Sequence, residues 1–345
     1  MNGRERGPRS LTAREAMDRW LNQQKTSKSE ETLETYFYRL KLFVEWCEGK
    51  GIATVSELSG WDFDTYENDR LAEDIAGTSL QNEMKTIRNW IEYLERIEAV
   101  DEGLSEKVHV PDVPDSEQSD ETKLHPNDAR PLLDYYRETP PLYGTVRHAW
   151  LELAWHTGAR MGGTRALDVR DYDSENRRVE FHHRPETDTP LKNKLDGERP
   201  VGFPRSVADV IDHYLQHHRH DLHDDHGRQP LFTTSQGRPA TNTIRDWSYR
   251  VTFPCVHNAC PHGYEPDDCD FKDPHQASKC PSSRSPHQVR TGSIIWQRDL
   301  GFPPEVVAER VNASIETIEQ YYDHATALEK LEERRRPYIE RMESE

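Results

Sequence analysis

The sequence predicts a mainly helical α+β protein with a small antiparallel sheet, built as two domains joined by a linker. Apolar residues recur at helical spacing through the first hundred positions, and a segment rich in Pro, Ser and acidic residues then interrupts this pattern. The remainder combines long helical patterns with a short stretch of strand alternation. A chain of 345 residues also exceeds what one hydrophobic core usually organises.

The first predicted domain, residues 1–105, reads as a small four-helix domain. Its strongest helix is expected over 27–51, where Ser27 and Glu30 fit a capping box. The apolar stripe of this helix comprises Leu33, Tyr36, Leu40, Phe43, Val44 and Cys47. The other helices are expected over residues 11–24, 58–71 and 78–100, the last with a stripe of Leu80, Met84, Ile87, Ile91 and Leu94.

Residues 106–124 are predicted to be an interdomain linker, since they are rich in Pro, Ser and acidic residues and show little periodicity. The second predicted domain follows at 125–345. Its helices are expected over 148–160, 206–218 and most of 291–342, and its strands over 177–184 and 198–204.

The composition excludes a membrane span, because only 33% of the residues are hydrophobic and no run of about 18 apolar residues occurs. The first ten residues are not followed by the apolar run of a secretory signal, so we expect a soluble, cytoplasmic protein. A net charge of −18 by itself argues against nucleic-acid binding. An acidic, Lys-poor surface is typical of proteins adapted to high salt, so a halophilic source is one hypothesis and an ordinary acidic cytosolic protein the other.

Arginine and lysine occur at two places suited to a reaction at a phosphate. Arg160 follows a sharp turn at Gly158, where a guanidinium can present its planar fork of donors to phosphate oxygens. Lys192 and Lys194 lie in the connection of the predicted hairpin, where a lysine can donate a proton to a leaving oxygen. Taken singly, each pattern is more often a surface arginine or a pair of solvated turn lysines.

Two further places lie near the C-terminus. His287 and Arg290 are one helical turn apart on a helix that Ser285 or its neighbour caps, and a helix N-terminus favours an anion. Tyr321 and Tyr322 lie on a later helix, and a tyrosine is a nucleophile once its proton is removed. Each pattern alone is also common in purely structural settings.

Together, in this order and spacing, the four places resemble the tyrosine recombinase (phage integrase) family, of haloarchaeal type, over nearly the whole chain. The resemblance implies a helical core-binding domain that binds DNA at 1–105 and a catalytic domain at 125–345. It implies a site-specific recombinase or integrase that cuts and rejoins double-stranded DNA through a 3′-phosphotyrosyl intermediate. It also implies a homo-tetramer on DNA and no catalytic cofactor.

The resemblance implies a role for each residue. Arg160 and Arg290 would neutralise the non-bridging phosphate oxygens. Lys194, five residues before an arginine, would protonate the 5′ leaving oxygen, and His287 would assist proton movement. Tyr322 would be the nucleophile because "YDH" fits the family's Tyr-x-His, whereas counting from the preceding loop favours Tyr321.

Two positions depart from the family pattern. Gly163 stands where an acidic residue is usual, and Asn312 stands where a His or Trp is usual. An active enzyme remains the leading hypothesis, since one auxiliary acid–base group contributes about 10² to 10⁴-fold. The alternatives are a catalytically weak or inactive DNA-binding protein that retains the recombinase fold, and a zinc-dependent hydrolase.

A Cys-rich insertion is predicted at 254–281. Four thiolates suit tetrahedral zinc, which would fold a loop that has no core of its own and position the helix that begins after Ser285. The alternatives are a disordered acidic insertion and disulfides. The predicted zinc ligands are Cys255, Cys260, Cys269 and Cys280.

Overall fold

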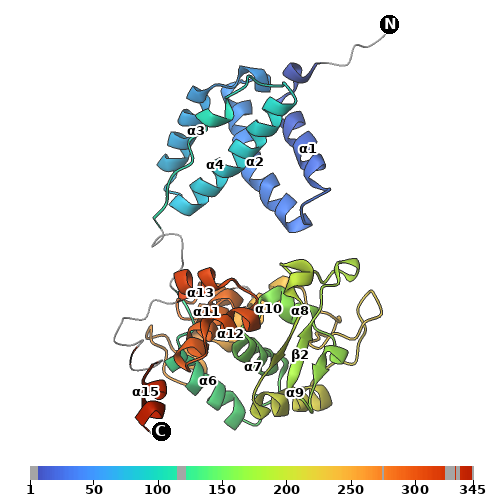
Figure 1. The fold of residues 1–345 in the computed structure, drawn as a ribbon, viewed down its shortest axis with the longest axis vertical. Coiled ribbons are helices and arrows are strands. Elements are labelled where there is room, and N and C mark those ends of the chain that lie inside the picture. Colours follow the sequence, from blue (N-terminus) through green and yellow to red (C-terminus); the bar gives the residue numbers. More distant parts are fainter. Residues whose placement is uncertain (1–6, 115–121, 274–275, 323–330, 332–334, 344–345) are drawn as a thin grey trace. The chain divides into compact units, whose positions relative to one another are not determined.

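The computed structural model divides the chain into two compact units, residues 1–120 and 121–345 (Figure 1). The described residues are 7–114, 122–273, 276–322, 331 and 335–343. Among them, no helix has both the length and the apolar character needed to cross a membrane.

The first unit consists of four main helices, which are α1 (Ala13–Gln24), α2 (Glu30–Lys50), α3 (Gly60–Ala72) and α4 (Gly77–Arg96). The whole predicted stripe of α4, from Leu80 to Leu94, is buried. Aromatic rings fill the centre, where Phe43 lies 5.0 Å from Tyr66 and 6.1 Å from Trp90, measured between ring centroids. The helical periodicity of the sequence therefore marks the core of this unit.

The predicted cap of α2 is wrong by two residues. Ser29, not Ser27, is the N-cap, and its hydroxyl accepts a hydrogen bond from the backbone N–H of Thr32. The reason is local, because both the backbone N–H and the hydroxyl of Ser27 bond to the carbonyl of Gln24. Ser27 thus closes the turn after α1, and α2 begins only once that turn is complete.

The second unit is built around α7 (Val146–Thr157), which is buried at every residue from His148 to Thr157. Figure 1 shows the helices gathered around it, and α7 packs against α6, α8, α9, α10 and α11. The remaining main helices are α6 (Pro126–Glu138), α8 (Met161–Ala166), α9 (Arg205–His217), α10 (Thr241–Val251), α11 (Pro286–Asp299), α12 (Pro304–Val311), α13 (Ile315–Tyr322) and α15 (Arg336–Glu343).

A three-stranded antiparallel sheet of order β1-β2-β3 lies in the same unit. The strands are β1 (Tyr172–Asp173), β2 (Arg178–Phe181) and β3 (Arg199–Gly202). Val179 pairs with Val201, and both are buried. The fold-class prediction is confirmed, although β1 has only two residues and no alternation that the sequence could reveal.

Gly292 allows α11 to lie directly against the chain that enters this unit. A Cβ added at Gly292 would lie 1.9 Å from the carbonyl oxygen of Leu124 and 3.0 Å from the Trp155 ring. Just beside this contact, the backbone N–H of Leu124 donates to the carbonyl of Gln288 at 3.1 Å. No side chain fits here unless the backbone moves.

We expect Gly292→Ala to lower the free energy of unfolding by about 1–3 kcal/mol, as overpacking does in cores. Gly162→Ala is the matched control, because a Cβ added at Gly162 in α8 meets nothing within 4 Å. The control is expected to be neutral or slightly stabilising, since alanine is the better helix former. Urea unfolding of the two variants measures the difference, and equal midpoints would contradict the close approach.

Candidate active site

A glycine turn places Arg160 at the start of α8. Gly158 ends α7 with a left-handed φ of 60°, and a Cβ there would lie 2.7 Å from a methyl carbon of Val311. Arg160 is the N-cap of α8, and its guanidinium donates to the backbone carbonyl of Asn312 at 2.7 Å. The turn therefore brings Arg160 against the end of α12, 152 residues further along the chain.

The helix that carries His287 and Arg290 begins with the predicted serine cap. The Ser285 hydroxyl accepts from the backbone N–H of Gln288, and the Gln288 side chain accepts from the backbone N–H of Ser285. This capping box fixes the first turn of α11. Within that turn the His287 side chain is exposed, whereas Arg290 is only 3% exposed.

Two backbone carbonyls orient the Arg290 guanidinium. It donates to the carbonyl of Gly158 at 2.5 Å and to that of Val311 at 2.7 Å. The end of α12 thus contacts both predicted phosphate-binding arginines, Arg290 through Val311 and Arg160 through Asn312. The structure brings together two residues that the sequence places 130 positions apart.

Lys194 lies on the long connection between β2 and β3. It begins a short 3-10 turn at Lys194–Gly197, and it adopts a left-handed φ of 53°. Its backbone N–H donates to the carbonyl of Leu191, and its side chain is exposed. A left-handed conformation is unfavourable for a residue with a Cβ, so neighbouring contacts must hold this turn.

Two arginines that the sequence reasoning did not assign complete a cationic cluster. Arg199 of β3 lies over the Phe181 ring, 4.5 Å from its centroid, and donates to the carbonyl of Arg310. Burial, and after it the nearby charges of Arg290, Arg160 and Arg310, together lower the pKa of Arg199 to about 9. Such mutual repulsion of guanidiniums is what an incoming phosphate relieves.

A separate group of arginines in this unit is paired with carboxylates instead. Asp168 is buried and accepts from Arg228 at 2.8 Å and from Arg238 at 2.6 Å, while Arg184 pairs with Asp171. Burial raises the pKa of Asp168, but the bonds from Arg228 and Arg238 outweigh it and hold the pKa below its usual value. These arginines are structural, because they are neutralised within the protein.

The bonds within the cationic cluster are of another kind. Arg160, Arg199 and Arg290 donate to backbone carbonyls, which carry no formal charge and so do not cancel the guanidinium charge. Arg310 likewise donates to the carbonyls of Gly202 and His156. These carbonyl bonds orient the guanidiniums without removing their charge, an arrangement that suits the binding of a phosphodiester through two of its oxygens.

Helix α13 carries both candidate nucleophiles. Ile318 is fully buried with Ile294 of α11 and Val307 of α12, so α13 packs on the helix that carries Arg290. Tyr321 and Tyr322 are the last two residues of α13, but their side chains lie outside the described part of the structure. The choice between them remains a prediction.

The four cysteines of the insertion lie in one region without forming a closed metal site. Cys255 packs against a buried apolar cluster that contains Cys280. Burial raises the pKa of Cys255, and the nearby Cys260 and Cys269 thiols add to this shift. All four thiols are free, and in the described part of the chain no three His, Cys, Asp or Glu side chains are arranged to hold a metal ion.

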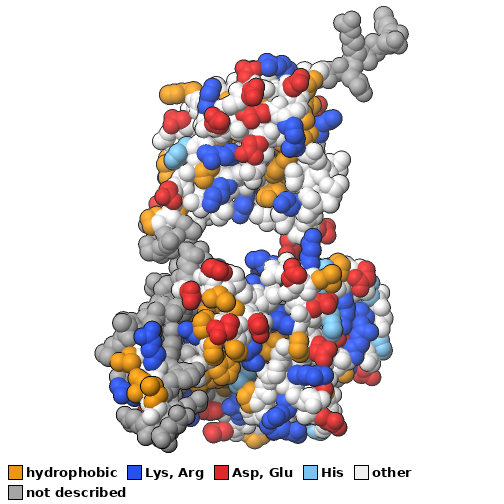
Figure 2. All heavy atoms as spheres, in the orientation of Figure 1, with side chains coloured by type: hydrophobic (Ala, Val, Ile, Leu, Met, Phe, Trp, Pro, Cys, Tyr) orange, Lys and Arg blue, Asp and Glu red, His pale blue; other side chains and the backbone are white. Residues whose placement is uncertain are grey.

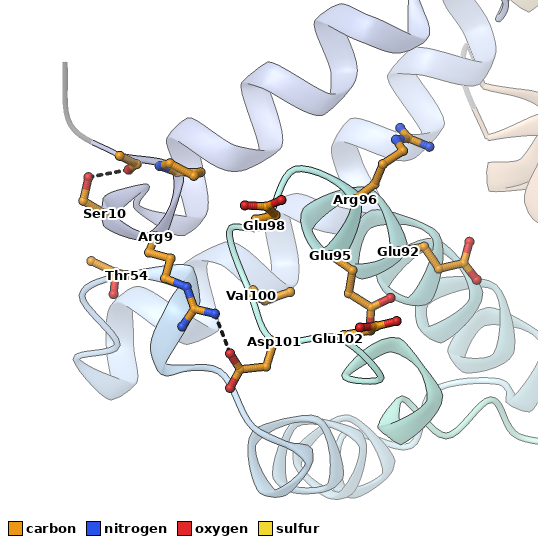
Figure 3. A pocket seen from close by; sticks show the side chains of 12 residues that line it. Arg9, Ser10, Thr54, Glu92, Glu95, Arg96, Glu98, Val100, Asp101 and Glu102 are labelled. Carbon is orange, nitrogen blue, oxygen red and sulfur yellow. Dashed lines mark hydrogen bonds and ion pairs between the residues drawn. The ribbon is translucent and has the colours of Figure 1, made fainter.

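A pocket of about 1190 Å³ in the first unit has the wrong charge for a phosphate (Figure 3). Arg9 on its wall pairs with Asp101 at 2.6 Å. The other acidic side chains that line it are Glu92, Glu95, Glu98 and Glu102.

Figure 2 shows acidic and basic side chains interspersed on the visible face of each unit. The cationic cluster is therefore identified from the contacts of its arginines and not from the net charge of the chain.

Neither a family model nor a curated protein matches the chain. Among solved structures, the chain is 48% identical to the N-terminal domain of a phage integrase/site-specific recombinase from Haloarcula marismortui. The match covers 98% of that domain and 30% of this chain, with a TM-score of 0.29. The chain belongs to the tyrosine recombinase (phage integrase) family. Its N-terminal unit is of the haloarchaeal type that the sequence indicates.

The tyrosine recombinase fold extends over both units. The Tn1549 transposon integrase, solved with a circular intermediate DNA, matches 96% of this chain and 100% of its own, with a TM-score of 0.68 and 14% identity. A lambda integrase dimer bound to a core site matches 94% of this chain and 77% of its own, with a TM-score of 0.60 and 10% identity. These matches establish the fold of this family member.

Sequence reasoning missed Arg199 and Arg310 as members of the cluster. In the sequence, Arg199 served only to identify Lys194, which lies five residues before it. Arg310 lies in a helical pattern that gives no indication of a role at a phosphate. Each is visible only once β3 and α12 are placed next to each other. The one available signal was the spacing from Lys194 to Arg199.

Proposed function

We propose that this chain is a site-specific DNA recombinase or integrase that acts through a 3′-phosphotyrosyl intermediate. The observation that supports it best is the cationic cluster, in which arginines far apart in sequence converge while bonded to carbonyl oxygens. A site of this kind stabilises the charge that develops on a phosphodiester in the transition state. Helix α13, which carries the predicted nucleophile, contacts α11, which carries Arg290.

In the proposed reaction, the Tyr322 hydroxyl loses its proton and attacks the scissile phosphorus. The new P–O bond to tyrosine forms as the P–O5′ bond breaks, and Lys194 supplies the proton that makes the leaving oxygen a 5′-hydroxyl. Arg160 and Arg290 hold the non-bridging oxygens. His287, which is exposed one helical turn before Arg290, accepts the tyrosine proton and returns it when the tyrosine is released. Attack by the 5′-hydroxyl of another strand reverses the steps and releases the tyrosine, so the reaction balances without a cofactor.

The test is a covalent adduct. Nicked duplexes that lose a short 5′-hydroxyl fragment on cleavage, tiled across the DNA flanking the gene, would be incubated with the full chain at high KCl concentration. We expect a protein–DNA species that survives denaturation in detergent. If no duplex yields it, the recombinase proposal is wrong.

One observation favours the alternative of a catalytically weak DNA-binding protein that retains the fold. Gly163 stands where the family usually has an acidic residue, and a Cβ added there would lie 3.4 Å from the Phe181 ring. The alternative predicts DNA binding without an adduct, so the same experiment separates the two functions.

The proposed partner is double-stranded DNA, and assembly into a homo-tetramer on DNA remains a prediction. Because nonspecific DNA affinity comes largely from counterion release and falls with salt, a high-salt recombinase would depend on direct arginine contacts. The cationic cluster supplies such contacts within a chain of net charge −18.

Structural zinc in the insertion belongs to the proposal. Its support is that Cys255 contacts the cluster containing Cys280 and lies near Cys260 and Cys269. We expect one zinc per chain by elemental analysis, lost in Cys280→Ser. Cys47→Ala is the control, because Cys47 is buried in the first unit. Unchanged zinc in Cys280→Ser, or no zinc in the unaltered chain, would overturn this part.

A further inference from the structure

Asn312 connects three parts of the site through one side chain. Its amide nitrogen donates to the carbonyl of Asp196 at 2.7 Å. Its amide oxygen accepts from the Asn193 side chain at 2.7 Å and from the Arg160 guanidinium at 3.3 Å. The backbone carbonyl of Asn312 also accepts from Arg160, at 2.7 Å.

The two residues of the β2–β3 connection that Asn312 contacts lie on either side of Lys194 in the sequence. Asn193 precedes Lys194 directly, and Asp196 follows it by two. Lys194 itself has the left-handed φ of 53° noted above. A left-handed residue with a Cβ costs about 1–2 kcal/mol, so it persists only where its surroundings hold it. Asn312 supplies such an anchor on both sides.

The end of α12 has the residue that this arrangement requires. Asn312 closes the helix at φ 53° and ψ 65°, a conformation that asparagine tolerates better than most residues. The short asparagine side chain also carries a hydrogen-bond donor and an acceptor on the same carbon atom, whereas a carboxylate only accepts and a hydrocarbon side chain does neither. Its backbone conformation and its side-chain chemistry therefore serve the same set of contacts.

We propose that Asn312 is a positioning residue that holds the turn carrying Lys194 against Arg160. The proton donor and the phosphate-binding guanidinium then meet at one phosphate. This inference rests on the proposed function. It assigns a role to the position where the family usually has a His or Trp, and that role acts through Lys194 and not through direct contact with the phosphate.

A substrate whose leaving group needs no proton tests this role. A duplex with sulfur in place of the 5′-bridging oxygen releases a thiolate, which leaves without a proton donor. With the normal oxygen substrate, we expect Asn312→Ala to slow adduct formation by about 10²-fold, the lower end for general acid–base help. With the sulfur substrate, we expect the deficit to shrink to a few-fold, as for Lys194→Ala.

Two further variants keep the test decisive. Asn312→Gly removes the same amide but adopts the left-handed φ of 53° more easily than alanine, so it should show the same oxygen-specific deficit even if Asn312→Ala folds poorly. Asn176→Ala is the control, because Asn176 makes its side-chain bond to Asp173 within the β1–β2 turn and should leave both rates unchanged. The double variant with Lys194→Ala should be no slower than Lys194→Ala alone, since the two act as a unit.

The outcomes are distinguishable. If Asn312→Ala and Asn312→Gly were each slowed equally on the two substrates, or if the double variant were slower by the product of the two single effects, the positioning role would be overturned. Absence of any adduct from the unaltered chain on either substrate would instead overturn the proposed function. Gel-shift measurements of DNA binding should show the same affinity for each Asn312 variant as for the unaltered chain.

Discussion

Replacing Tyr322 by phenylalanine is expected to abolish the covalent protein–DNA adduct completely while leaving DNA binding intact. The substitution removes a single oxygen, so α13 and its buried Ile318 keep their packing. Without the hydroxyl, no P–O bond to the protein can form. Denaturing gels after incubation with the nicked duplexes measure the adduct, and gel shifts measure binding.

Tyr321→Phe is the matched control for this prediction. Neighbouring residues on an α-helix point about 100° apart, so the two hydroxyls cannot both face the same phosphate. We expect Tyr321→Phe to retain adduct formation. An adduct that persists in Tyr322→Phe and disappears in Tyr321→Phe would reverse the assignment. An adduct in both single variants and in the double variant would exclude both tyrosines of α13 as the nucleophile.

Arg160→Ala is expected to slow cleavage by about 10² to 10³-fold, the cost of removing one preorganised donor from a developing anion. Weak DNA binding should remain measurable, because one phosphate contact among many is lost and the salt dependence changes by about one unit of slope. Single-turnover adduct formation measures cleavage, and binding at several salt concentrations measures the slope.

Arg160→Lys separates charge from geometry. Lysine keeps the positive charge but lacks the planar fork of donors that can contact two phosphate oxygens. We expect partial recovery relative to Arg160→Ala. Cleavage by Arg160→Ala at the unaltered rate would show that Arg160 has no role at the phosphate.

Much of the helical framework is predictable from the sequence because burial and helical period coincide. The stripe from Leu80 to Leu94 predicts α4 and its buried face, and the Ser285 cap predicts where α11 begins. The predicted N-cap of α2 was wrong because Ser27 already bonds to the carbonyl of Gln24 in the turn that follows α1. Local chemistry at a helix start therefore depends on where the preceding element ends.

The site is less predictable, because its decisive contacts join distant segments. Arg160, Lys194 and Arg290 are recognisable by pattern and spacing, but nothing near Asn312 in the sequence indicates that its amide bridges Asn193, Asp196 and Arg160. By pattern alone Asn312 is only a missing His or Trp. The structure shows which residues Asn312 contacts, and a sequence motif does not carry that information.

The close contact at Gly292 has a practical consequence for any isolated catalytic fragment. Leu124 bonds to Gln288, and the carbonyl of Lys123 accepts from the Arg284 side chain, so the first residues of the second unit are fastened to the start of α11. A clone that begins at residue 125, where the sequence places the domain boundary, deletes both bonds. It would expose the buried face that Leu124 covers next to the helix of His287 and Arg290. A useful fragment must begin upstream of Lys123.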